Sequence, residues 1–533
     1  MNQSVPVTFN FSQDVMLRWA RQTPDSLALW CVDEMHHTEQ RLTFAEMADR
    51  MRRAASFFLA MGIRPGDCVV MVLPRVQEWW VCMLGLTYIG AVPIPGTPML
   101  TEKDLAYRFA AAGPAAVMSD AECAGKIDSA TTVGNLVRII VGASRPGWAT
   151  FTLDDDPNPP LIPTLSTDPG LMYFTSGTSG PPKMALHTQA SYALGHRVTG
   201  EHWLCLRPGD VHWVLADVGW GKAAWSAFFG PWQMGATVFA CTGPAKFHPK
   251  STLKMLSTYP INSFCAPPTA LRLMVLEDLS SYRFPHLRHC TAAGESLTPD
   301  ILTRWQETTG LTIHEGYGQT ETTLLVGSFA RFGRPVRPGS MGHPAPGMDI
   351  RLVDDELNEV PAGQEGNLVV RVSPHRPLGL FKGYYRDPAG TAFRFRGGYY
   401  FTGDVARRDE EGYFYFLGRA DDVINSASYR IGPFEVESAL AMHPDVLESA
   451  VVAHPDSLRG EVVKAYVVLR PGGRLHEVDV DAMRHELQEH CKKVTAPYKY
   501  PRLIEFVGEL PKTTNGKIRR AALRQQQQQA SGV

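Results

Sequence analysis

A segment rich in glycine and hydroxyl side chains, Thr175-Ser-Gly-Thr-Ser-Gly-Pro-Pro-Lys183, carries the clearest chemistry in the sequence and follows a strand-like run at 171–174. Its glycines allow tight turns that expose backbone N–H groups, its hydroxyls add donors, and Lys183 adds a positive charge. These are the groups that wrap a polyphosphate. The segment is not a Walker loop, because no Gly-Lys-Ser/Thr ends it. By composition alone, a flexible Ser/Gly linker is an equal alternative.

A second segment, Glu315-Gly-Tyr-Gly-Gln-Thr-Glu321, could complete a nucleotide site. Its Gly-flanked Tyr317 could stack on a purine, and Thr320 could donate to a phosphate. The carboxylate of Glu321 could hold the magnesium ion that accompanies ATP. Taken alone, the same residues could form a turn that leads into a capped helix.

A carboxylate and an arginine follow in two neighbouring segments, Tyr400-Phe-Thr-Gly-Asp404 and Gly418-Arg-Ala-Asp-Asp422. Asp404 is suited to both hydroxyls of a ribose, although Gly-Asp pairs are also common in plain turns. Arg419 could neutralise a phosphate or share that ribose.

The last segment with chemical potential is Pro511-Lys-Thr-Thr-Asn-Gly-Lys-Ile-Arg519. Its Asn-Gly pair predicts a hairpin turn that presents Lys517 at the tip. Without the other segments, Lys517 would be interpreted as a solvated surface lysine.

The sequence around these segments predicts a layered α/β architecture in the first three quarters of the chain. Thr43 and Glu46 form a capping-box signature ahead of an amphipathic run that ends near Gly62. The acidic, Pro-rich stretch 154–163 predicts a surface connection. Short β-branched runs predict strands at 68–73, 137–141, 262–266 and 289–292.

After Gly418 the pattern changes to that of a compact α+β unit of ordinary domain size. We expect helices at 434–442 and 478–491, and strands at 449–453 and 462–469. The predicted organisation is an N-terminal domain over 1–418, a connection at 419–422, a C-terminal domain over 423–524 and a disordered Gln-rich tail over 525–533.

Length and composition narrow the class of protein. A chain of 533 residues is too long for one ordinary core. Lys and Arg total 52 against 54 Asp and Glu, which gives no reason to expect a broad nucleic-acid-binding face. The nine cysteines are an odd number without a C-x-x-C pair, which fits a reducing compartment. No signal or transit pattern begins the chain, and its most apolar stretch, 81–95, is too short for a bilayer, so we expect a cytoplasmic enzyme.

In this order, and with 400–404 and 418–422 counted as one motif, these segments resemble the adenylate-forming family of acyl-CoA synthetases, luciferases and peptide-synthetase adenylation domains. The resemblance covers about residues 9–524 and is closest to the medium-chain acyl-CoA synthetases. It is carried by Asn10-Phe-Ser, Leu73-Pro-Arg-Val, Tyr173-Phe-Thr-Ser-Gly-Thr-Ser-Gly, Tyr317-Gly-Gln-Thr-Glu, Tyr429-Arg-Ile-Gly-Pro and Ala496-Pro-Tyr-Lys-Tyr-Pro-Arg. Four motifs at suitable separations weigh against the linker and turn interpretations.

The resemblance implies an ATP-dependent acid–thiol ligase of fatty acid metabolism. Such an enzyme converts a carboxylic acid and ATP into acyl-AMP and pyrophosphate, and then forms acyl-CoA and AMP from coenzyme A, with Mg²⁺ accompanying ATP. It also implies a large N-terminal domain, a hinge at Asp421 and a small mobile C-terminal domain that swings between the two half-reactions.

By the same resemblance, the 175–183 loop holds the β- and γ-phosphates, Glu321 binds magnesium, and Tyr317 lies against the adenine. Asp404 and Arg419 would bind the ribose, and Lys517 would reach the α-phosphate only in the first closed state. Thr175, Glu321 and Lys517 are the implied catalytic residues. The full implied ATP and AMP site consists of Thr175, Ser176, Gly177, Thr178, Ser179, Gly180, Lys183, Gly294, Glu295, Ser296, Glu315, Gly316, Tyr317, Gly318, Gln319, Thr320, Asp404, Arg419 and Lys517.

In the second state, the rotated domain would bring further residues towards coenzyme A, whose phosphates suit the basic members. The family usually has Ser-Gly-Tyr-Arg before Ile-Gly-Pro, and in this chain the expected glycine is Ser428. That glycine lines the path of the pantetheine arm, so Ser428 bears directly on the thioester step; neutral change at a tolerant position is the alternative. The implied coenzyme A set is Ser428, Tyr429, Arg430, Arg459, Lys492 and Tyr500.

The acid pocket is expected to be roomy. In acetyl-CoA synthetases a tryptophan takes the place of Gly318 and closes the pocket. Trp220 would form an apolar wall and Gly221 would leave extra room. A medium-chain, branched or aryl acid is therefore expected, although a buried Trp is often only core.

Three other functions share part of this pattern. The first is an adenylating enzyme that passes its acyl group to a carrier-protein thiol or an amine. The second is a non-catalytic sensor, which would have no need of Lys517. The third is a luciferase-like oxygenase, which only light output would distinguish. A protein acetyltransferase acting on Lys517 is a further hypothesis, since a neutral amide could not serve the α-phosphate.

Overall fold

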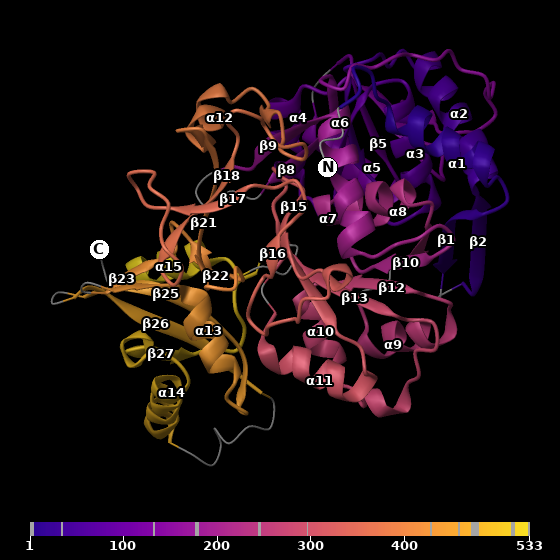
Figure 1. Cartoon of the computed structure of the whole chain (residues 1–533). Helices are drawn as coiled ribbons and strands as arrows, with labels where there is room; N and C mark the ends of the chain where they lie inside the picture. The colour runs from indigo at the N-terminus through magenta and orange to yellow at the C-terminus, as the bar shows by residue number, and fades with distance from the viewer. Residues whose placement is uncertain are drawn as a thin grey trace.

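Figure 1 shows a computed structural model of the chain, in which the C-terminal part, coloured orange to yellow, lies to one side of a larger N-terminal body. The structure describes residues 5–33, 36–131, 134–175, 181–242, 247–295, 297–426, 429–456, 459–470, 479–512 and 518–530. Among the predicted site residues, 176–180, Ser296, Ser428 and Lys517 lie outside the described residues. Tyr429 and Arg430 are described by their backbone alone.

A nine-stranded sheet forms the centre of the N-terminal body. Its middle strands pair in parallel, and the strands at both ends pair antiparallel. In spatial order it contains β16 (His343–Pro344), β15 (Leu324–Gly327), β14 (Ile313–Gly318), β13 (His289–Ala293), β12 (Ser263–Ala266), β10 (Val211–Val214), β11 (Thr237–Cys241), β1 (Leu27–Asp33) and β2 (Thr38–Thr43). The helices α9 (Pro249–Thr258), α10 (Pro268–Met274) and α11 (Pro299–Thr309) connect its strands.

A second sheet of five parallel strands lies nearer the N-terminus. Its order is β4 (Val92–Gly96), β3 (Cys68–Val72), β5 (Ala116–Ser119), β6 (Val137–Ile140) and β7 (Ala149–Thr150). Alternate residues of β3 pack into two different cores: Val69 and Met71 into one, Val70 and Val72 into the other. This two-residue period explains why β3 is apolar along its whole length, since both faces of a parallel sheet are covered by helices. The helices beside it are α2 (Phe44–Ala60), α3 (Gln77–Tyr88), α4 (Glu102–Ala112) and α5 (Ala121–Ala130).

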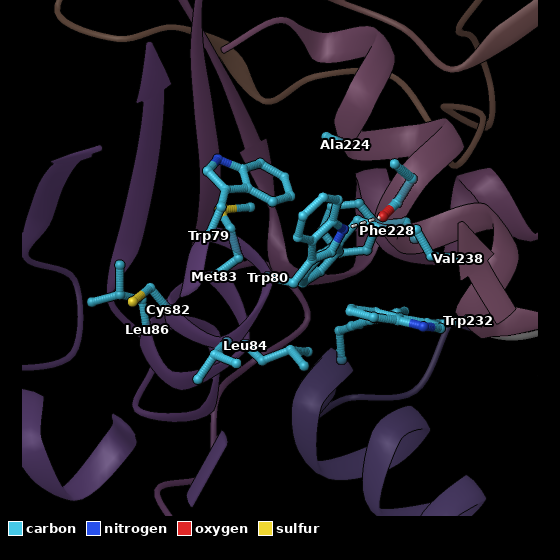
Figure 2. Close-up of a cluster of buried hydrophobic side chains, with 14 of the residues drawn as sticks. Trp79, Trp80, Cys82, Met83, Leu84, Leu86, Ala224, Phe228, Trp232 and Val238 are labelled. Atoms are coloured by element: carbon cyan, nitrogen blue, oxygen red, sulfur yellow. Dashed lines mark hydrogen bonds between the residues drawn. The ribbon is translucent and has the colours of Figure 1, made fainter. Parts of the chain in front are cut away.

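Helix α3 is buried almost all round, and Figure 2 shows its Trp79 and Trp80 among the aromatic side chains that pack beside it. The Trp80 indole N–H donates to the Ala227 carbonyl at 2.7 Å, so this large side chain is buried without losing its hydrogen bond. Ring contacts then continue from Trp79 to Phe228 and from Phe228 to Trp232. The aromatic cluster fixes the 221–233 segment, which also borders the site described below.

Two smaller sheets complete the N-terminal part. One is antiparallel and contains β19 (Gly383–Tyr384), β9 (Lys183–Thr188) and β8 (Pro169–Thr175). The other contains β17 (Ile350–Val353), β18 (Glu365–Arg371), β21 (Tyr399–Arg408) and β20 (Phe395–Arg396), with β22 (Phe414–Arg419) paired to β21. Helix α12 (Pro388–Arg394) joins the first of these sheets to the second.

The C-terminal unit is a five-stranded sheet with helices on both faces. Its strands are β24 (Tyr429–Ile431), β23 (Ile424–Ser426), β26 (Gly460–Leu469), β25 (Val446–Asp456) and β27 (Leu503–Phe506). Its core combines Ile424, Val463 and Val451 with residues of α13 (Pro433–Ala441) and α14 (Val480–Val494). The first C-terminal strand begins five residues after β22 ends, so the described elements meet at the predicted connection.

Most predicted elements are present. Thr43 and Glu46 form a complete capping box at the start of α2. The predicted strands correspond to β3, β6, β12, β13, β25 and β26, and the two C-terminal helices to α13 and α14. The mixed α/β fold with a large N-terminal and a small C-terminal domain is confirmed.

The expected disorder from Gln525 onward is wrong for the described residues. Helix α15 runs from Arg520 to Ala530, and Leu523 and Gln527 are buried. Glutamine is a good helix former, and Leu523 packs against Ala450 and Val452 of β25. The Gln527 Oε1 atom lies 3.3 Å from His454 Nδ1, so even the polar face of this helix has a partner.

No helix among the described residues is both long and apolar enough to cross a bilayer.

Candidate active site

A cavity of about 530 Å³ opens where several parallel strands of the large sheet end. Its walls include residues that directly follow β10, β12, β13 and β14, namely Leu215, Pro267, Gly294 and Gln319. Ligands bind in this position in open α/β sheets, outside the carboxyl ends of the strands. Of the predicted site residues, the cavity wall contains Trp220, Gly221, Gly294, Glu295, Gly316, Gly318, Gln319 and Thr320.

Asp404, which is 3% exposed, connects three of the predicted segments. Its Oδ1 atom accepts a hydrogen bond from Arg419 Nη1 at 2.9 Å, because β21 and β22 pair with these two residues opposite each other. Its Oδ2 atom accepts from Gln319 Nε2 at 2.7 Å and from the Tyr317 hydroxyl. Burial raises the pKa of Asp404, and Arg419, Tyr317 and Gln319 act against that rise. Sequence segments up to 102 positions apart therefore meet at one buried carboxylate.

Tyr384 contacts both Glu321 and Lys183, the last residue of the predicted phosphate-binding segment. No sequence motif predicts a role for Tyr384. The Tyr384 hydroxyl donates to Glu321 Oε1 at 2.8 Å, and Lys183 Nζ lies 4.8 Å from the centre of the Tyr384 ring. Strand β19 places Tyr384 beside β9, at whose start Lys183 lies. Lys183 also pairs with Asp387 at 3.0 Å. No short sequence spacing marks Tyr384, because its contacts come from residues far away in the chain.

The loop itself is the connection of an antiparallel hairpin. Thr175 ends β8 and Lys183 begins β9, and these two residues are paired in register. The predicted phosphate-binding residues 176–180 lie between them and outside the described residues. The hairpin fixes both ends of the segment.

Glu315 binds a backbone N–H group beside the cavity through its carboxylate. Its Oε1 atom accepts from the Leu297 backbone N–H at 3.1 Å, and burial raises its pKa to about 8. Glu315 and Tyr317 are not among the cavity-wall residues. The Glu315 carbonyl accepts from the indole of Trp203 at 3.0 Å, and a side chain at Gly316 would collide with that indole. Glu315 and Gly316 thus make packing contacts that support the predicted nucleotide-binding segments.

The predicted acid pocket residues Trp220, Gly221 and Gly318 all belong to the cavity wall. A Cβ atom at Gly318 would lie 2.5 Å from the Thr323 carbonyl oxygen, so the local backbone itself requires glycine there. The Tyr192 hydroxyl donates to the Gly221 carbonyl at 3.1 Å, and Lys222 Nζ donates to the Ala293 carbonyl at 3.1 Å. The remaining wall is mostly apolar and includes residues that the sequence did not reveal: Met99, Trp203, Trp213, Leu215, Trp225, Phe247 and Met255.

His187 and His314, which adjoin the motifs, are buried and structural. His187 Nε2 lies 2.7 Å from the Thr320 carbonyl oxygen, and burial lowers its pKa to about 4. His314 stacks on His289 at 4.8 Å, and burial lowers its pKa to about 4 as well. Both imidazoles are therefore neutral at physiological pH and hold the segments in place.

The connection between the domains carries ion pairs on both sides. On the N-terminal side, Arg419 Nε lies 3.6 Å from Asp421 Oδ1. On the C-terminal side, buried Asp422 accepts from Arg524 Nη1 at 2.5 Å. Arg520, from the same helix α15, pairs with Glu437 of α13 through two contacts of 2.7 Å. Helix α15 is thus attached to the last residue of the connection and to α13.

The predicted coenzyme A residues form two groups in the C-terminal unit. Lys492 Nζ lies 4.4 Å from the centre of the Tyr500 ring and pairs with Glu489 at 2.6 Å. Ser426 pairs with both Tyr429 and Gly460, so the backbone of Tyr429 and exposed Arg459 lie at the same end of the sheet. Whether these groups bind coenzyme A stays a prediction.

Among the described residues, no group of three or more His, Cys, Asp or Glu side chains could hold a metal ion by itself. Mg²⁺ that accompanies ATP is bound by one or two carboxylates together with the phosphates, and the magnesium site at Glu321 stays a prediction. Glu321 offers such a carboxylate.

Comparison with known proteins agrees with this geometry. The chain matches the AMP-binding enzyme family over residues 16–385 and the C-terminal domain of AMP-binding enzymes over residues 435–517. It is 45% identical to human acyl-coenzyme A synthetase ACSM3, mitochondrial, over 98% of this chain and 90% of that protein. Among solved structures, it resembles the anthranilate CoA ligase AuaEII in complex with anthranoyl-AMP (TM-score 0.88, 27% identity, 99% of both chains). It also resembles a benzoate CoA ligase from Burkholderia xenovorans LB400 (TM-score 0.84, 26% identity, 97% of this chain and 100% of that one). The chain therefore belongs to the AMP-binding enzyme family and, within it, to the acyl-coenzyme A synthetases.

Proposed function

We propose that this chain activates a carboxylic acid in two half-reactions. In the first, a carboxylate oxygen attacks the α-phosphorus of ATP, the bond to the β-phosphate oxygen breaks, and acyl-AMP and pyrophosphate form. In the second, the thiol of coenzyme A loses its proton and its sulfur attacks the acyl carbon, so that acyl-CoA and AMP form. The carboxylate is itself the nucleophile, and the protein contributes mainly position and charge.

The observation that carries this proposal is the convergence on Asp404. Tyr317, Gln319 and Arg419 come from two separate motifs and bind the same buried carboxylate, and Gln319 also belongs to the cavity wall. A ribose held here would place its phosphates between Arg419 and the Lys183 loop. Glu321 lies in the same segment as Gln319, and Mg²⁺ bound there would neutralise charge on the phosphates. Lys517 is proposed to serve the α-phosphate.

The cavity supports an acid with a sizeable apolar part. Its wall includes the apolar side chains of Trp213, Leu215, Phe247 and Met255, and the wall residues Gly221 and Gly318 carry no side chain. We propose a medium-chain, branched or aryl carboxylic acid as substrate. Such groups gain binding energy by leaving water, at about 25 cal/mol per Å² of apolar surface.

Transfer to a carrier-protein thiol or an amine is the less favoured alternative, since the close relatives are named as coenzyme A synthetases. A cytoplasmic location stays a proposal, which fractionation of the source cells would test.

The test uses purified protein with ATP, Mg²⁺ and a panel of straight-chain, branched and aryl acids, with and without coenzyme A. Mass spectrometry follows AMP, acyl-AMP and acyl-CoA. Acyl-CoA from one acid class is the expected result. Acyl-AMP that accumulates and ignores coenzyme A would refute the second half-reaction, and the absence of any acyl-AMP would refute the first.

A further inference from the structure

A second arginine lies beside Arg419, outside all four motifs. Arg394 is the last residue of α12, and its Nη1 atom donates to the Phe401 carbonyl at 3.3 Å. Gly403 has a φ of +77°, and a Cβ atom there would collide with Arg394 Nη1 and lie 3.2 Å from Arg419 Nη2. The two guanidinium groups therefore converge over Gly403, the residue that precedes Asp404.

The cations around this point differ in their carboxylate partners. Arg419 is paired with Asp404 at 2.9 Å and lies 3.6 Å from Asp421, and Lys183 is paired with Asp387 at 3.0 Å. Across the described residues, Arg394 has no carboxylate within 4.0 Å. Two guanidinium groups held side by side repel each other unless an anion lies between them. Arginine pairs strongly with phosphate oxygens in such places.

Arg394 also lies next to the group that holds Glu321. Burial and the neighbouring Glu321 raise the pKa of the Tyr384 phenol, and Arg394 lowers it. Tyr384 donates to Glu321 at 2.8 Å. Arg394 is thus positioned between the proposed magnesium carboxylate, Glu321, and the proposed ribose pair, Asp404 with Arg419. An ATP molecule that reached from one to the other would carry its phosphates past Arg394.

We propose that Arg394 binds the phosphates of ATP that leave as pyrophosphate. This inference rests on the proposed function. It assigns to Arg394 a role in the first half-reaction and none in the second, because pyrophosphate has left before coenzyme A reacts.

The test compares Arg394→Gln and Arg394→Lys with the wild type. Arg396→Gln is the matched control, since Arg396 lies two residues away and its guanidinium covers the Phe401 ring at 3.5 Å. Three quantities are measured: KM for ATP in acyl-AMP formation, inhibition by added pyrophosphate, and the rate of acyl-CoA formation from preformed acyl-AMP. A thermal melt of each variant checks that it is folded.

For Arg394→Gln we expect KM for ATP to rise roughly tenfold or more, with weaker inhibition by pyrophosphate. The rate from preformed acyl-AMP should stay at the wild-type value, Arg394→Lys should recover part of the loss, and Arg396→Gln should resemble the wild type. An unchanged KM for ATP overturns the proposal, and so does an equal loss in both half-reactions. If the wild type itself makes no acyl-AMP, the proposed function has failed rather than the assignment of Arg394.

Discussion

At the scale of single residues, two buried carboxylates of the site have different surroundings. Asp404 is paired with a guanidinium, whereas Glu315 accepts one backbone hydrogen bond and, among the described residues, has no cation partner. Burial without a charge partner disfavours the ionised form of a carboxyl group. Glu315 is therefore the residue of this pair whose protonation should affect folding near neutral pH.

Glu315→Gln should make the stability of the protein less sensitive to pH. The folded protein raises the pKa of Glu315 from 4.5 to about 8, so it binds a proton that the unfolded chain has released. The stabilisation that Glu315 contributes through its raised pKa is complete below about pH 4.5 and is lost as pH rises towards about 8. Over that range, melting temperatures of the wild type should fall relative to those of Glu315→Gln. Melting curves of the two proteins that shift in parallel with pH would contradict this.

At the scale of secondary-structure elements, helix α15 lies close in sequence to Lys517 and contacts the connection between the domains. It begins three residues after Lys517, and two of its arginines form the ion pairs with Asp422 and Glu437. Asp422 is 7% exposed, and removal of Arg524 would leave its charge only the longer contact with Arg520, at 3.9 Å. We therefore expect these ion pairs to hold α15 against the last residue of the connection between the domains.

A double-mutant cycle on Asp422→Asn and Arg524→Gln measures this attachment. We expect a coupling free energy of about 1–3 kcal/mol, together with faster hydrogen exchange along α15 in either single variant. The control pair is Arg145 and Asp128, whose side chains are 37% and 36% exposed, and which should couple by about 1 kcal/mol or less. Equal coupling in both pairs would show that α15 is held by packing alone.

The elements also show what the sequence could predict. Strand β3 was predictable because every residue of Cys68–Val72 is buried, and α2 because its cap is local. The helical end of the chain was missed because a run of glutamines was interpreted by composition, while the burial of Leu523 depends on β25. Tyr384 and Arg394 were missed for a related reason. Tyr384 and Glu321 are 63 positions apart in the sequence, and no local sequence pattern predicts a hydrogen bond between them.

At the scale of the whole molecule, the proposed chemistry requires the C-terminal unit to deliver different residues at different times. Lys517 belongs to that unit and lies outside the described residues. Lys517→Ala should abolish formation of acyl-AMP while ATP binding largely survives, since removal of a charge aimed at the transition state costs several kcal/mol, on the order of 3. Calorimetry of ATP binding and a pyrophosphate-release assay would check the two halves of this statement. A wild-type rate of acyl-AMP formation would refute it.

Ser428→Gly tests the other half of the cycle. Serine is small, and we expect the substitution to change the rate of acyl-CoA formation from preformed acyl-AMP by no more than about twofold. The rate of acyl-AMP formation should stay at the wild-type value. A large acceleration of the coenzyme A step alone would show that the Ser428 side chain obstructs the path of the thiol.

The bonds already made by Asp404 have a consequence for turnover. An ionised carboxylate offers about four lone-pair positions, and Arg419, Tyr317 and Gln319 occupy three of them. One position is left for the two hydroxyls of a ribose, so at least one hydroxyl can be accepted only by exchange, in which a protein donor gives up its place. Because one hydrogen bond replaces another, exchange adds little net affinity, and the nucleoside would be recognised but bound weakly. For an enzyme that must release AMP at the end of every cycle, a carboxylate that already accepts hydrogen bonds from the protein would favour rapid product release.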